Sequence, residues 1–129
     1  MIDEGLHDGD PKYRLAQLQD ALLRGCRYLV EIRMHTQGMK VEQAAKFFED
    51  NGYQNPHNAM VEALRGTNDP GYLRYQLGKL MILKLREDVR KQQGAAFDLG
   101  KFHDAFLKQG AVPIRLIRRA MLGSDGPLL

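Results

Sequence analysis

The stretch that decides the fold runs from Asp69 to Arg86 and reads DPGYLRYQLGKLMILKLR. Asp69-Pro70 supplies an N-cap residue followed by proline, which predicts that a helix begins there. Apolar residues then follow with few interruptions, as is typical of a helix buried in a core. Gly78 lies inside this predicted helix, where a glycine costs roughly 1 kcal/mol relative to alanine. We therefore expect another backbone or a ligand to approach Gly78 closely.

Outward from this stretch, caps and apolar spacings of three and four predict further helices. The full set is expected at about residues 11–37, 41–50, 56–66, 70–94, 98–110 and 113–123. No run of β-branched residues alternates as it would in a strand. The sequence therefore predicts an all-α fold, an irregular antiparallel bundle of about six helices. We expect one domain over residues 1–129, with residues 1–10 as a loop or arm.

Composition excludes few classes of protein. The chain has 129 residues, of which 43% are hydrophobic and 27% charged, and its net charge of +3 is only mildly basic. We expect no nucleic-acid partner from this charge, and no membrane span because no apolar run approaches the roughly 20 residues required. The acidic opening, MIDEGLHDGD, does not fit a signal peptide, and the compartment stays open. Cys26 is the one cysteine and lies on the apolar face of the first helix, where a thiol is inert.

A line of polar residues follows the first predicted helix at steps of four, three, four and four: Asp20, Arg24, Arg27, Glu31 and His35. One interpretation is a solvated face with ordinary ion pairs, including Arg27 with Glu31. The other is that the line borders a cleft, with His35 as a hydrogen-bond donor at its end. The sequence leaves both open.

Two tyrosines, Tyr72 and Tyr75, are expected one turn apart at the start of the apolar helix. In one interpretation both are packing groups. In the sharper interpretation, one phenol points into a cleft and donates a hydrogen bond to developing negative charge.

No metal-binding, nucleophile or phosphate-loop motif occurs, so we expect no metal site in this chain. Three arginines on the last helix, Arg115, Arg118 and Arg119, are interpreted as a solvated face.

Several phrases, in this order and spacing, carry a family resemblance. They are RYLVEIRMHTQGM from Arg27, DPGYLRYQLGKLMILKLR from Asp69, FDLGKFHDAFLKQGAVPI from Phe97 and IRRAML near the end. Together they resemble the C-terminal part of the bacterial family called domain of unknown function 885. Its members look like longer, mostly helical zinc metallopeptidases whose HExxH-type motif precedes the region matched here. The resemblance therefore implies a C-terminal segment of a larger peptidase-like fold, without its metal.

The resemblance also assigns roles. It implies that Tyr75 and His35 contact the substrate or the oxyanion in the full-length context, and that Tyr72, Gly78 and Arg27 bind substrate. Zinc is expected in the full-length protein and no cofactor in this chain. The expected partners are the N-terminal part of the same family protein, a peptide substrate and, for the isolated chain, a second copy. The alternative is a stand-alone helical module for protein–protein interaction.

Overall fold

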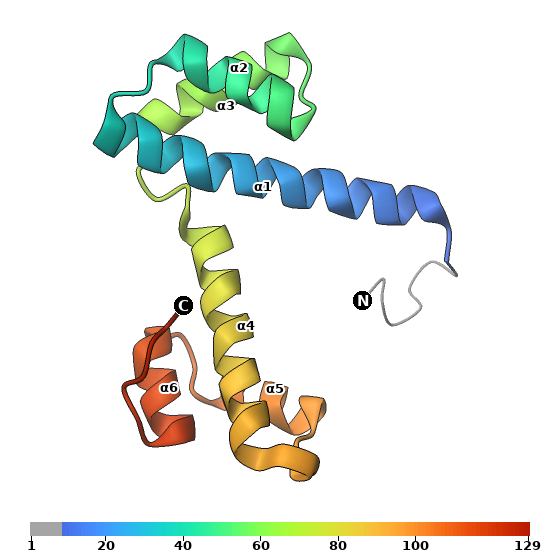
Figure 1. Ribbon diagram of the computed structural model, residues 1–129, viewed down its shortest axis with the longest axis vertical. Helices are drawn as coiled ribbons and strands as arrows, with labels where there is room; N and C mark the ends of the chain where they lie inside the picture. The colour runs from blue at the N-terminus through green and yellow to red at the C-terminus, as the bar shows by residue number, and fades with distance from the viewer. Residues whose placement is uncertain (1–8) are drawn as a thin grey trace. The chain divides into compact units, whose positions relative to one another are not determined.

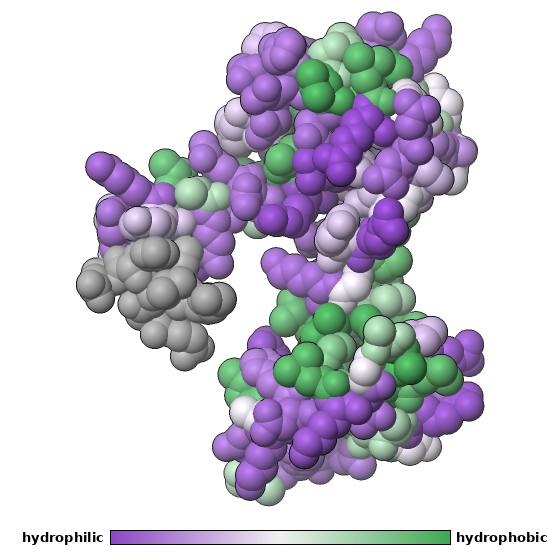
Figure 2. Space-filling model, turned by 180° about the vertical axis from the view of Figure 1, so that it is seen from behind, coloured by the Kyte–Doolittle hydropathy of each residue, from purple (hydrophilic) through white to green (hydrophobic). Residues whose placement is uncertain are grey.

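The computed structural model describes residues 9–129, and most of the arm expected over residues 1–10 lies outside this range. Over the described residues the chain is all-α, with six α-helices and no strand, as the sequence predicts. It divides into two compact units, the first ending at Gln76 and the second running from Leu77 to Leu129. Figure 2 shows hydrophobic side chains at the surface of each unit, among hydrophilic ones. Within the described residues, no helix is long and apolar enough to cross a membrane.

The first unit begins with α1, Pro11–Gln37, whose predicted limits are confirmed. The Asp10 side chain accepts a hydrogen bond from the Lys12 amide at 2.9 Å, and Gly38 ends the helix with a φ of 69°. Two shorter helices follow, α2 at Val41–Gly52 and α3 at Pro56–Asn68. Figure 1 shows α2 and α3 side by side over the C-terminal part of α1.

Small residues let these three helices pack closely. The core consists of Cys26, Val30, Ala44, Ala45, Phe48, Ala59, Ala63 and Tyr72, all buried. A Cβ at Gly52 would lie only 3.2 Å from the Cys26 sulfur, so the end of α2 reaches α1 because it ends in glycine. Burial raises the pKa of the Cys26 thiol, as expected for an inert cysteine.

The helix predicted to begin at Asp69-Pro70 begins later, and this prediction was wrong. α4 runs Arg74–Gln93, and residues 70–73 form turns. The Asp69 side chain accepts from the Gly71 amide at 3.1 Å, a local bond that competes with helix formation. The turn carries Tyr72 into the core, where it is 3% exposed. Tyr72 and Tyr75 are therefore not neighbours along one helix.

Two further expectations for this helix concern Gly78 and burial. Among the described residues, no atom outside its own helix lies within 4 Å of a Cβ built on Gly78, so no other segment of residues 9–129 approaches this glycine closely. The helix is also less buried than its composition suggests, because only Leu85 and Val89 of α4 are buried.

The second unit packs α5, Leu99–Lys108, and α6, Ile114–Leu122, with α4. A short 3₁₀ helix, η2 at Gly94–Ala96, follows α4 and was not predicted. The core consists of Leu85, Val89, Phe102 and Ile117. Arg118 is buried as well, and its guanidinium donates to the Asp88 carboxylate at 2.6 Å. The expectation of a solvated face was therefore wrong for Arg118, which joins α6 to α4.

Candidate functional site

A small polar pocket lies in the first unit, where α1, α3 and the turn before α4 come together. It has a volume of about 190 Å³ and is lined by Arg24, Arg27, Arg65, Tyr72 and Tyr75. The two arginines of α1 are one turn apart, so they share a face of that helix. Arg65 comes from α3, and Tyr75 from the first turn of α4. Three of the five residues, Arg27, Tyr72 and Tyr75, are ones that the family resemblance singled out.

The pocket's inner side is held by an ion pair between α1 and α3. The Arg27 Nε and Nη2 atoms donate to the two carboxylate oxygens of Glu62 at 2.7 and 2.6 Å. This is the bidentate geometry that makes an arginine–carboxylate pair strong. Glu62 was not predicted as a partner, because Arg27 was expected to pair with Glu31 along the same helix.

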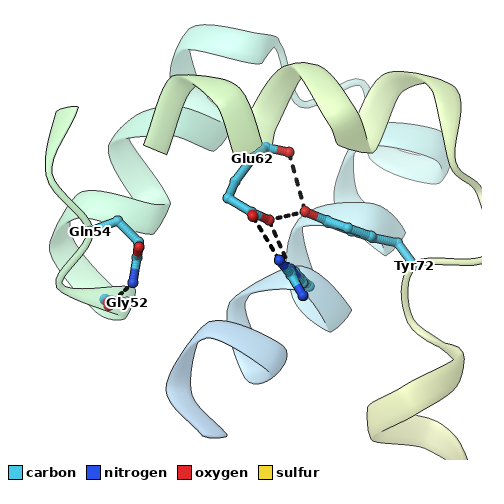
Figure 3. A network of polar contacts seen from close by, with 5 residues as sticks. Gly52, Gln54, Glu62 and Tyr72 are labelled. Atoms are coloured by element: carbon cyan, nitrogen blue, oxygen red, sulfur yellow. Dashed lines mark hydrogen bonds and ion pairs between the residues drawn. The ribbon is translucent and has the colours of Figure 1, made fainter. Parts of the chain in front are cut away.

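Tyr72 completes this network. Its hydroxyl donates to the same Glu62 carboxylate, as Figure 3 shows with the two side chains pointing toward one another. Burial, and then the hydrogen bond to Glu62, raise the pKa of Tyr72, so the phenol stays protonated. Burial alone would raise the pKa of Glu62, but the hydrogen bonds from Arg27 and Tyr72 hold it below its usual value.

The Tyr72 ring also orders the arginines. The guanidinium carbons of Arg27 and Arg65 lie 5.0 and 5.3 Å from its centroid, within the range of cation–π attraction. Tyr72 is thus a packing group, which was the plainer of the two interpretations, and its hydroxyl is not free for a ligand.

The outer side of the pocket is open to a ligand. Tyr75 is 68% exposed, so its phenol can meet a molecule from solvent. Arg24 contacts Asp20 at 3.4 Å, but both side chains are about half exposed or more, and such pairs contribute little. Arg65 forms no ion pair among residues 9–129, although its charge helps to lower the pKa of the nearby Glu62 carboxylate.

Two of the predicted site residues do not line this pocket. The His35 Nε2 lies 3.0 Å from the carbonyl oxygen of Gly66 and donates to it, which ties the end of α1 to α3. Gly78 lies beyond the residues that form the pocket.

Glu31, from the polar line of α1, is not solvated. It is 2% exposed, and its Oε2 has no hydrogen-bond partner within the described residues. Burial raises its pKa, although a hydrogen bond from the Leu73 backbone opposes this. The polar line is therefore neither a uniform solvated face nor one cleft border: Asp20 and Arg24 form an exposed pair, whereas Arg27 and His35 bind residues of α3 and Glu31 is buried.

Sequence reasoning missed Arg65, which lines the pocket, and Glu62, which binds Arg27 at its inner side. Both lie on α3, three positions apart and so on one face, which is the signal that could have identified them. Without knowing that this face meets α1, however, each is an ordinary charged residue on a short helix.

Residues 1–121 match the model of a family described as bacterial protein of unknown function DUF885. The chain belongs to this DUF885 family. The match covers the first unit, most of the second and every pocket residue. Searches of the curated proteins and of the solved structures find no match.

Proposed function

We propose that this DUF885 chain is the C-terminal helical segment of a zinc-dependent peptidase and forms one wall of its substrate cleft. The observation that carries the proposal is the gathering of Arg27, Tyr72 and Tyr75 around one cationic pocket. Arg27 is distant in sequence from the two tyrosines, and all three are residues that the sequence analysis expects at the substrate site. The segment is inactive without the zinc-binding part that precedes it in the longer protein.

Residues 9–129 do not fit a zinc site, since no three His, Cys, Asp or Glu side chains among them could hold a metal ion together. In our proposal the ligands belong to the zinc-binding part that the family resemblance places before the region matched here. No role assigned to the residues below depends on contact with the metal.

Tyr75 is the substrate-contacting residue in this proposal. Its exposed phenol can donate a hydrogen bond to the substrate's carbonyl oxygen as negative charge develops there. His35 is a weaker choice, because its Nε2 is used by Gly66. Glu62 and Tyr72 are positioning residues that hold Arg27 at the pocket.

The test is to join this chain to the zinc-binding region of a longer family member and to measure hydrolysis of a fluorogenic peptide with zinc present. Tyr75→Phe should lower kcat/KM by about 10²–10³, the usual effect of losing one oxyanion donor. Tyr53→Phe is the matched control, because Tyr53 is also exposed, at 74%, but lies away from the pocket. An inactive fusion, or unchanged hydrolysis by Tyr75→Phe, contradicts the proposal.

The alternative, a helical module for protein–protein interaction, is favoured by a different feature. A groove of about 560 Å³ lies between α1 and α2, and its lining is almost entirely apolar. Leu18, Leu22 and Leu29 of α1 line it, and each is more than 40% exposed. Contiguous exposed apolar surface marks interaction sites. In our main proposal the N-terminal part of the family protein covers this groove.

A further inference from the structure

The arginines of the pocket outnumber the carboxylates that hold them. Glu62 compensates Arg27 in a bidentate pair, whereas Arg24 has a loose, exposed contact with Asp20. Arg65 forms no ion pair among the described residues, and the one carboxylate whose pKa its charge lowers, Glu62, is already bound by Arg27. Three guanidinium groups line the pocket against the carboxylates of Asp20 and Glu62, so an excess of positive charge remains and the pocket attracts an anion.

The shape of these groups and the proposed function together indicate the kind of anion. A guanidinium presents a planar fork of N–H donors that matches a carboxylate or a phosphate bidentately, and a peptide substrate offers a carboxylate. Arg65 is restrained by its contact with the Tyr72 ring, so less freedom is lost when it binds. The pocket's volume of about 190 Å³ is below the roughly 300–1,000 Å³ of sites that enclose a whole small molecule. It therefore suits the end of a ligand.

We infer that the pocket binds the free C-terminal carboxylate of a peptide through Arg65 and Arg24, which makes the proposed peptidase an exopeptidase acting at the carboxyl end. This inference rests on the proposed function for its substrate class. The carbonyl of the last peptide bond lies one residue from the terminal carboxylate, and consecutive Cα atoms are about 3.8 Å apart. Tyr75, at the same pocket, is thus near the bond that such an enzyme would cleave.

Binding to the 129-residue chain tests this without zinc or hydrolysis. An acetylated pentapeptide is titrated as its free acid and as its C-terminal amide, and the side-chain Nε–Hε resonances of the arginines are followed by NMR. The free acid should bind at least about tenfold more tightly than the amide, the effect of losing one charge-assisted contact. Equal affinity for acid and amide overturns the inference.

Variants identify the site. Arg65→Gln should weaken binding of the free acid about tenfold and leave binding of the amide unchanged. Arg90→Gln is the matched control, because Arg90 is exposed, lies in the second unit and pairs with Glu87. Arg24→Gln is the second variant, and like Arg65 it is exposed, so the fold should tolerate both changes. An equal effect of Arg65→Gln and Arg90→Gln overturns the inference.

Inorganic phosphate distinguishes a carboxylate site from a general anion site. It should compete with the free acid only weakly, and phosphate that binds as tightly as the peptide overturns the inference. These outcomes are separate from the hydrolysis test. A fusion that is inactive while the free acid still binds at Arg65 contradicts the proposed function and leaves the carboxylate pocket standing.

Discussion

Glu62→Gln tests the network that builds the pocket. The change keeps the size of the side chain but removes the charge that Arg27 contacts at 2.6 and 2.7 Å and that the Tyr72 hydroxyl also faces. Removing one partner of a fully buried pair costs about 3–5 kcal/mol. Here the side chains of Arg27 and Glu62 are 21% and 15% exposed, so solvent recovers part of this cost. We expect the free energy of unfolding to fall by about 2–3 kcal/mol.

The assay is urea denaturation followed by circular dichroism at 222 nm, with amide hydrogen exchange to locate the loss. Exchange should quicken in α1–α3 and not in α5 and α6, which belong to the other unit. Glu49→Gln on α2 makes the same chemical change without disturbing this pair, and it should stay within about 0.5 kcal/mol of the original chain.

The pH dependence of stability provides a second measurement of the Arg27–Glu62 pair. The folded-state pKa of Glu62 lies below its ordinary value of 4.5, so its contribution to stability is present above pH 4.5 and is lost as the pH falls below it. The original chain and Glu62→Gln should therefore converge in stability in strong acid. A loss below about 1 kcal/mol at pH 7, or additive effects of Glu62→Gln and Arg27→Gln, would refute the reasoning.

Two further predictions concern α1. Burial raises the folded-state pKa of Glu31 above 4.5, so the folded chain loses stability as the pH rises through that pKa. Glu31→Gln should therefore be more stable than the original chain at pH 7 but not at pH 4. Denaturation at both pH values checks this, and an unchanged difference contradicts it. The isolated chain should form a dimer or larger assembly through its apolar groove. Leu22→Lys, in the groove, should make it a monomer. Leu107→Lys, at a more exposed leucine of α5, is the control and should leave the assembly intact. Light scattering after size-exclusion chromatography measures this, and a monomeric original chain at micromolar concentration counts against it.

Local signals determined most of the helices. Asp10, Asn55 and Asp98 each cap a helix through a side-chain hydrogen bond, and Gly38 and Gly123 each end one in a left-handed conformation. Such bonds join residues two or three positions apart, so a sequence carries them without any knowledge of the fold.

The start of α4 was decided by tertiary structure. The Asp69-Pro70 signal predicts a helix, yet a turn is formed there, because it places the Tyr72 ring in the core and its hydroxyl on Glu62. The turn keeps backbone hydrogen bonds of its own, from the Tyr72 amide to the Asp69 carbonyl and from the Arg74 amide to the Gly71 carbonyl, and it adds the burial of the Tyr72 ring.

The residues of the candidate site were likewise predicted only in part from the sequence. The sequence and its family resemblance identified Arg27, Tyr72 and Tyr75, but the packing of α3 on α1 was needed to add Arg65 and to replace Glu31 by Glu62 as the partner of Arg27. Only the tertiary structure buries Glu31, which belongs to the polar line of α1. The sequence by itself determined where most of the helices begin and end, since those interactions are local; the start of α4 is the exception. Which charges meet depended on residues 35 positions apart in the chain, and only the tertiary structure brings them within hydrogen-bonding distance.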